Sequence, residues 1–309
     1  MPTQLELDEA RARWRELAGE DPGLGPIAAF HEARLASLAA RPAPDAAVEI
    51  SREDADRALR DGRPLLAAGR LAVDPVELQD ELRRTCEELA ATADEGSSAL
   101  AAATVLARAT VDVARLVVPA LEDDRDVVAR EANALGVDAT ALGELLQLAV
   151  QPALWEAAVQ ARAVVDLDRW DRGFCPLCGS WPALAELVGP ERRRVLRCVR
   201  CGSGWSWLVL LCPYCGTDDH RELGSLAETD AGGRTRGIAS VDTCERCRGY
   251  VKAVAAFTSY SAPRIVAEDV ATLDLDVAAG EAGYRRPGDV DPAVAGIPRL
   301  VREGRALPG

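Results

Sequence analysis

The stretch from Cys175 to Cys247 carries eight of the nine cysteines as four Cys-x-x-Cys pairs: CPLC (175–178), CVRC (198–201), CPYC (212–215) and CERC (244–247). Each pair places two sulfurs on one tight turn, and two such turns supply the four thiolates that zinc or iron accepts in a tetrahedral site. We therefore predict two metal sites, and the candidate ligands are Cys175, Cys178, Cys198, Cys201, Cys212, Cys215, Cys244 and Cys247.

The pairing of these turns has two solutions. Sequential pairing spans loops of 19 and 28 residues, and both loops can close because closure entropy grows slowly with length. Nested pairing would join the second turn to the third across ten residues, and we leave it as the alternative. Glycine follows the second sulfur of three turns, at 179, 202 and 216, where the backbone needs a positive φ that glycine adopts freely.

Other uses of cysteine fit the pattern less well. A thioredoxin-like dithiol would occur once, inside a βαβ unit, and disulfides need an oxidising compartment. The N-terminus, MPTQLELDEARARW, is charged and has no apolar run, which is not typical of a secretory signal. We expect a cytoplasmic protein with reduced thiols.

Charge and length narrow the range of partners. The 309-residue chain has a formal net charge of −14, so it repels nucleic acid and anionic membranes overall. Residues 172–260 carry 12 Arg and Lys against 9 Asp and Glu, an excess that eight thiolates on two divalent ions would cancel. No segment reaches the roughly 20 apolar residues of a membrane helix. We expect neither nucleic acid nor membrane as a partner, and homo-oligomerisation stays open.

The sequence before residue 170 indicates helices. Apolar periodicity and caps predict helices over 4–18, 27–40, 74–93, 97–118, 124–136, 138–150 and 153–166, with Pro119 and Pro152 as breaks. His31 and Cys86 fall on apolar stripes, so we expect both to pack in the core. We find no Ser/His/Asp set and no glycine-rich phosphate loop, and we therefore predict no enzyme activity.

The cysteine region and the C-terminus read differently. We predict strands over 204–211 and 251–258, a solvated loop at Arg192–Arg194, and tryptophans 170, 181, 205 and 207 packed around the metal sites. Gly232-Gly233 predicts a mobile turn. A final helix is expected over 268–279, with Val270, Leu273 and Val277 on its buried face and Asp269, Asp274 and Asp276 mostly outward. The tail from Gly283 is expected to be poorly ordered.

The predicted fold class is α+β with several domains. An all-α helical domain (1–168) precedes two rubredoxin-like or zinc-ribbon-like four-cysteine modules (169–209 and 210–262), and a C-terminal helix and tail (263–309) follow.

Five segments, in this order, resemble the FdhE family of formate dehydrogenase accessory proteins: CPLCGSWPALAELVG, LRCVRCGSGWSW, CPYCGT, CERCRGYVK and EDVATLDLDVAAGEAGYRR. The resemblance covers about residues 170–287. It implies a non-enzymatic cytoplasmic factor, chaperone-like in role, that contacts the catalytic subunit of formate dehydrogenase during maturation and binds iron through the eight cysteines. The chain departs from the family at Leu208–Leu211, where basic residues are expected.

Two other functions are the alternatives. A four-thiolate iron site can exchange one electron, which would make the protein a rubredoxin-like redox carrier or sensor. A zinc-ribbon nucleic-acid binder is the weaker alternative because of the charge. Four sulfurs suit iron and zinc equally, so both stay candidates for the two ions.

Overall fold

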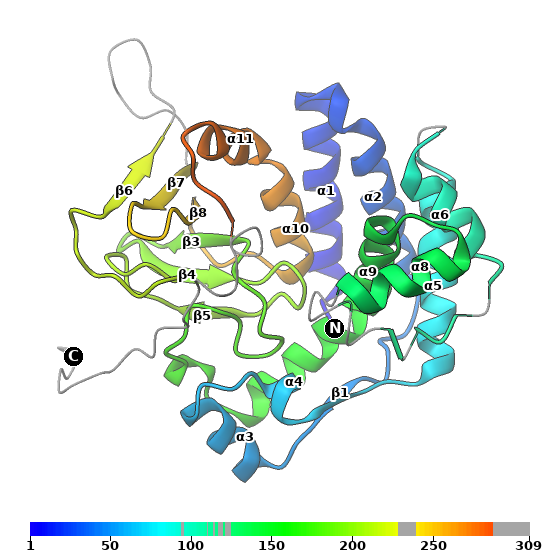
Figure 1. The fold of residues 1–309 in the computed structure, drawn as a ribbon, viewed down its shortest axis with the longest axis horizontal. Coiled ribbons are helices and arrows are strands. Elements are labelled where there is room, and N and C mark those ends of the chain that lie inside the picture. Colours follow the sequence, from blue (N-terminus) through cyan, green and yellow to red (C-terminus); the bar gives the residue numbers. More distant parts are fainter. Residues whose placement is uncertain are drawn as a thin grey trace.

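The computed structural model describes residues 1–286 apart from 94–95, 110, 114, 117–119, 121–124 and 228–238. Helices form one half of the molecule and a six-stranded sheet the other, with α10 (Ala262–Val270) lying between the sheet and α1 (Gln4–Glu20) (Figure 1). The predicted fold class, helical first and then a sheet with two four-cysteine clusters, is confirmed.

The helical half is built from elements between residues 4 and 164. After α1 come a 3-10 turn (Pro22–Leu24), α2 (Gly25–Ala39), α3 (Arg52–Arg60), α4 (Leu65–Ala68), α5 (Pro75–Ala90), α6 (Ser98–Leu106), α8 (Arg125–Leu135) and α9 (Ala139–Val164). A two-stranded ribbon, β1 (Ala47–Glu49) with β2 (Arg70–Ala72), is an addition that we did not predict.

Side-chain caps fix several helix starts where the sequence predicts them. Asp74, Ser97 and Asp138 each accept a hydrogen bond from a backbone N–H in the first turn of α5, α6 and α9, which satisfies donors that have no partner inside the helix. The predicted core positions of two residues are also confirmed. Cys86 is fully buried, and His31 stacks on Trp14 with ring centroids 4.4 Å apart.

Pro152 does not end a helix, so the prediction of separate helices over 138–150 and 153–166 is wrong. α9 runs unbroken through it for 26 residues. Proline lacks the N–H that would bind the carbonyl of Leu148, and the buried Arg34 guanidinium donates to that oxygen instead. A distant side chain therefore replaces the missing bond.

The predicted helix over 97–118 is also wrong in its length. α6 ends at Leu106, and residues 107–109 form a turn. Beyond it the N–H of Val111 donates to Oε1 of Gln79 on α5 at 3.3 Å, a side-chain partner in place of a helical carbonyl.

The sheet has the strand order β5-β4-β3-β8-β7-β6. Its strands are β3 (Leu184–Val188), β4 (Arg193–Arg197), β5 (Gly204–Ser206), β6 (Leu223–Leu226), β7 (Ala239–Cys244) and β8 (Tyr250–Ala256). Each cysteine site repeats one plan, in which a turn, two strands, a second turn and a third strand follow in order. The repeats join edge to edge where β3 pairs in parallel with β8, and the other pairs in the sheet are antiparallel.

Two predictions near β5 are wrong. The strand predicted over 204–211 stops at Ser206, because Arg194 holds the following residues in a loop. The prediction of a solvated loop at Arg192–Arg194 fails only at Arg194, since Arg192 and Arg193 are exposed. Arg194 is buried in β4: its Nη1 donates to the carbonyls of Leu208 and Val209, and its Nη2 lies 2.8 Å from Asp242.

The helix predicted over 268–279 is two helices, α10 and α11 (Leu273–Glu281). The ammonium of Lys252, fully buried in β8, donates to the carbonyls of Asp269 and Thr272 and thereby ends α10. The expected faces are wrong in part. Val270 packs against a core cluster and Asp274 is exposed, as predicted. However, Leu273 and Val277 are exposed, whereas Asp269 and Asp276 form ion pairs with Lys252 at 2.7 and 2.8 Å.

Residues 283–286 are held against the second cysteine site, so the start of the expected poorly ordered tail is misplaced. Arg285 N–H donates to the carbonyl of Arg248, and Arg286 pairs with Asp269 and Asp276. The rest of the tail, the Gly232-Gly233 turn, Pro119 and Asp124 lie outside the described residues. Within the described ranges, none of the helices combines the length and hydrophobicity needed to cross a membrane.

Candidate metal centres

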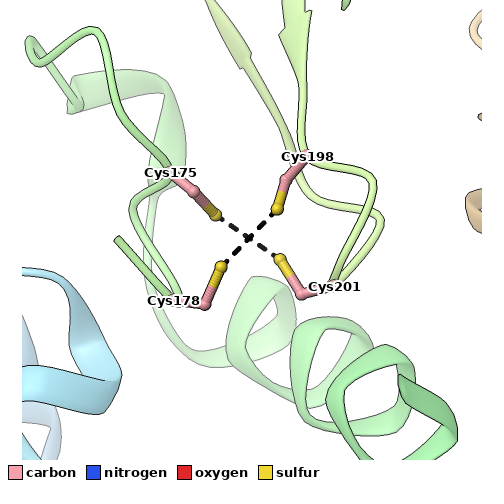
Figure 2. Close-up of side chains that lie close together, drawn as sticks. All are labelled: Cys175, Cys178, Cys198 and Cys201. Carbon is pink, nitrogen blue, oxygen red and sulfur yellow. Dashed lines mark hydrogen bonds between the residues drawn. The ribbon is translucent and has the colours of Figure 1, made fainter. Parts of the chain in front are cut away.

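The first cysteine site brings together Cys175, Cys178, Cys198 and Cys201 (Figure 2). Its two turns share one hydrogen-bond pattern. The N–H of the first cysteine donates to the carbonyl of the residue five positions later, and the N–H of the glycine after the second cysteine donates to the carbonyl of the first cysteine. These bonds are Cys175 to Ser180 (2.8 Å), Gly179 to Cys175 (3.0 Å), Cys198 to Ser203 and Gly202 to Cys198 (both 2.9 Å). Gly179 and Gly202 have φ of 81° and 70°, which confirms why glycine stands there.

The second cysteine site groups Cys212, Cys215, Cys244 and Cys247. The turn at Cys212 repeats the pattern with Gly216, but the turn at Cys244 has Arg248 where the others have glycine. Arg248 adopts a φ of 57°, a left-handed conformation that costs a side-chain-bearing residue roughly 1–2 kcal/mol. Its guanidinium donates to the carbonyl of Ala282 and lies 4.2 Å over the ring of Tyr284.

The pairing of turns is sequential in the structure. Within each site the four sulfurs lie within 4.8 Å of one another. The second and third turns, which nested pairing would join, belong to different sites. All eight cysteines are free thiols, so no disulfide links them in this structure.

The spacing of the sulfurs fits a tetrahedral ion. Metal–sulfur bonds of about 2.3 Å give sulfur–sulfur edges of roughly 3.8 Å in a tetrahedron. The Sγ atoms of Cys175 and Cys201 are 3.4 Å apart and those of Cys178 and Cys198 3.5 Å, while the corresponding edges of the second site are 3.7 and 3.6 Å. Each cluster could therefore hold one metal ion, and four sulfurs leave no coordination position for a substrate.

The thiols in each cluster share protons unequally. Hydrogen bonds from its neighbours, first of all Cys175, hold the pKa of Cys178 well below its usual value, while burial raises the pKa of Cys175 and Cys201. In the second site a hydrogen bond from Cys212 lowers the pKa of Cys244 to about 2. Because cysteine binds a metal ion as a thiolate, a bound cation would stabilise the deprotonated form of all four ligands in each cluster.

Aromatic rings surround the two sites, as the tryptophan content predicts. Trp170, Trp205 and Trp207 are buried. Trp181 from the first repeat meets Tyr214 from the second in an edge contact, with centroids 5.3 Å apart. These rings cover the sites because each repeat has few aliphatic side chains of its own.

The first site also contacts the helical half directly. The N–H groups of Leu65 and Leu66 on α4 donate to the carbonyls of Pro176 and Leu177, both at 2.9 Å. Gln151 on α9, the helix that passes beneath the site in Figure 2, donates to the carbonyl of Val199 at 3.2 Å. A Cβ on Gly202 would lie 2.1 Å from that of Ala262 on α10, so the second turn is wedged against two helices.

Fold and sites define a class of protein with a helical first half and a sheet that carries two repeats of a four-cysteine turn motif. Comparison with known proteins supports a family resemblance. The family model "FdhE, C-terminal domain" matches residues 210–292, and the resemblance to the FdhE family predicted from the sequence is confirmed.

Curated relatives and a solved structure agree with this match. Proteins named "Protein FdhE homolog" are 32% identical over 149 residues in Pseudomonas aeruginosa and 28% identical over 141 residues in Aquifex aeolicus. These matches cover 47% and 44% of this chain and 46% of each relative, so the chain spans just under half the length of the curated relatives it matches. The crystal structure of the FdhE protein from Pseudomonas aeruginosa shares the fold, with a TM-score of 0.63, 23% identity, and coverage of 93% of this chain and 95% of that chain.

Proposed function

We propose that this protein is a non-enzymatic accessory factor in the maturation of formate dehydrogenase, and that it acts in the cytoplasm by binding the catalytic subunit. The observation that carries the proposal is the match of the family model "FdhE, C-terminal domain" to residues 210–292, a segment that contains the whole second cysteine site. We further propose that all eight cysteines are ligands of two ions, iron or zinc. Because each cluster is complete with four sulfurs, the ions would stabilise a binding scaffold rather than activate a substrate.

An exposed apolar loop is the surface that best fits a protein client. Leu208, Val209 and Leu210 are 57%, 58% and 62% exposed. The loop is nevertheless held in place, since Arg194 donates to its carbonyls and Trp207 Nε1 donates to that of Leu211 at 2.9 Å. Contiguous exposed apolar side chains on a fixed loop are typical of protein–protein contacts.

Co-purification with the catalytic subunit of formate dehydrogenase tests the proposal. We expect the parent protein to retain the subunit and the variant Leu208→Ser/Leu210→Ser to retain at least tenfold less, since two anchor side chains are lost. The matched control is Val76→Ser, because Val76 is 67% exposed on α5 in the helical half. Absence of any complex with the parent protein would refute the proposal, and equal retention by the two serine variants would exclude this loop.

A redox role is the second candidate, and one observation favours it. Cys178, Cys215 and Cys247 are only partly buried, so electrons or oxidants could reach the ligands of an iron ion. Metal analysis with a visible absorption spectrum decides this point. A ferric four-thiolate site absorbs strongly in the visible range, whereas a colourless protein with two equivalents of zinc would exclude electron transfer.

A further inference from the structure

The turns of the second cysteine site pack directly against the repeat that carries the first. Gly173, two residues before Cys175, lies against Pro213, the residue after Cys212. A Cβ on Gly173 would lie 1.7 Å from the carbonyl oxygen of Pro213, which is far shorter than an ordinary van der Waals contact. The two backbones therefore touch beside a ligand of each site, with no room for a side chain between them.

Arg194 connects the first repeat to both turns of the second site. This buried residue of β4 donates from Nη1 to the carbonyl of Leu211 at 3.4 Å, and its Nη2 lies 2.8 Å from Asp242. Leu211 directly precedes Cys212, and Asp242 lies two residues before Cys244. One rigid guanidinium therefore holds the chain ahead of both turns.

The ring of Tyr214 makes a further connection between the repeats. Tyr214 lies inside the turn between Cys212 and Cys215, and its ring contacts that of Trp181 from the first repeat with centroids 5.3 Å apart. The same ring packs on Gly249 at the end of the last turn, where a Cβ would lie 2.6 Å from Cδ2 of the ring. The second site is thus assembled on side chains and backbone of the first repeat.

These contacts link the two sites because each ion supplies much of the order around its own cysteines. In small metal-binding modules the binding of the ion is also the folding of the residues around it. When one site is filled, the contacts that it shares with the other are already in place, so the other ion has fewer groups to order. Coupling between two binding sites is reciprocal, so each ion then stabilises the other.

We propose that the two sites bind their ions cooperatively and that Arg194 is the positioning residue that couples them. This coupling rests on the proposed binding of two ions by the eight cysteines, and it does not depend on binding of formate dehydrogenase. The expected factor is about tenfold, as is common for two linked sites. That factor is small beside the affinity of a four-thiolate site, so the first ion stays bound when the second site is removed.

Hydrogen exchange at the first site, measured after changes at the second, tests the coupling. The zinc-saturated full-length protein is compared with Cys212→Ser/Cys215→Ser, with Arg194→Met and with the combination of all three changes. The amide N–H groups of Gly179 and Gly202 close the turns of the first site, so their exchange reports how often that site opens. Native mass spectrometry counts the ions bound to each variant.

The coupling predicts effects that do not add. Loss of the second site should speed exchange at both glycines about tenfold, and Arg194→Met should do the same while both ions remain bound. The combined variant should exchange no faster than the faster of the two, because Arg194 can no longer transmit the effect of a site that is already lost. The control is Arg193→Met: Arg193 is the exposed neighbour of Arg194 in β4, and its loss should leave exchange unchanged.

Faster exchange without additivity supports the proposal. Unchanged exchange in Cys212→Ser/Cys215→Ser would overturn it, and so would an effect of Arg194→Met that is equally large with and without the second site, because Arg194 would then support the first repeat alone. If Cys212→Ser/Cys215→Ser loses both ions, equal exchange in Arg194→Met and Arg193→Met overturns the proposal. Fewer than two ions on the parent protein would instead refute the proposed metal ligands, and the coupling with them.

Discussion

The two cysteine sites have the same plan but different supports. The first is packed against the helical half through α4, α9 and α10, and Cys175, Cys198 and Cys201 are fully buried. The second is held by its own repeat and by the C-terminal segment: Tyr214 donates to the carbonyl of Tyr250 and Arg248 to that of Ala282. Two of its cysteines, Cys215 and Cys247, are partly exposed. Two sites with the same four ligands can therefore differ in stability, because the packing around each site determines how much of the fold is lost when its ion is lost.

The largest expected effect comes from removing one turn of each site. Cys175→Ser/Cys178→Ser should release both ions and much of the sheet, whereas Cys212→Ser/Cys215→Ser should release one ion and leave the first site intact. The scale is set by structural zinc, which contributes roughly 10–16 kcal/mol of apparent binding free energy. Metal content and circular dichroism check both variants. Equal losses of metal and of circular dichroism signal in the two variants would show that packing against the helices does not distinguish the sites.

The next effect concerns the support of the second site by α10 and α11. Lys252→Met leaves Asp269 and Asp276 with Arg286 as their remaining ion-pair partner, and breaking a buried ion pair in this way costs about 3 kcal/mol or more. We expect a lower free energy of unfolding and faster loss of the second ion to a chelator, while the first ion is retained. Simultaneous loss of both ions would contradict the division of supports.

The interactions of Asp276 in this cluster predict that the protein loses stability as the pH falls into the acid range. Burial alone would raise the pKa of Asp276, but hydrogen bonds from Lys252 and Tyr250 hold it below its usual value. A carboxyl with a lowered folded pKa stabilises the protein above its unfolded pKa of about 3.9, and the stability is lost as pH falls through the folded pKa. Asp276→Asn should therefore be less stable than the parent near neutral pH and lose less stability on acidification, as denaturant titrations at several pH values can measure.

A matched pair of glycines gives a smaller effect. Gly202 and Gly216 occupy equivalent positions with φ of 70° and 68°. Gly216→Ala should cost roughly 1–2 kcal/mol for the left-handed backbone, and Gly202→Ala should cost about 1–3 kcal/mol more because its Cβ would collide with Ala262. Thermal unfolding checks the difference, and a larger loss in Gly216→Ala would contradict the wedge at the first site.

The smallest effect is expected at the turn without glycine. Arg248→Gly removes about 1–2 kcal/mol of backbone strain but also the contacts to Ala282 and Tyr284. We expect a nearly unchanged melting temperature and faster amide hydrogen exchange at residues 279–285. Unchanged exchange there would show that Arg248 does not anchor this segment.

The sequence was sufficient to predict the features that depend on residues close together in the chain. Four Cys-x-x-Cys turns predicted both clusters but left sequential and nested grouping open, and a proline after Asp74 predicted the start of α5. The turns also carried a signal that we did not use, because CERC is followed by arginine where the other three have glycine.

Partners far apart in the chain account for the errors. α9 continues through Pro152 because Arg34, more than a hundred residues earlier, binds the carbonyl left free. The break between α10 and α11 depends on a lysine in β8, and the end of β5 on an arginine in β4. Local propensity cannot reveal any of these, since each is a charged side chain that became buried only when separate elements of the chain packed against one another.

The parallel pairing of β3 with β8 also sets the order in which parts of the sheet can form during protein synthesis. The last ligand of the first site, Cys201, leaves the ribosome 46 residues ahead of Cys247, a delay of roughly 2–9 s at typical translation rates. β8 emerges later still, so the seam between the repeats cannot exist when the first ligand set is already complete. A nascent chain can therefore load its first ion while the second half of the sheet is still being made, with the already synthesised helices as its only folded neighbour.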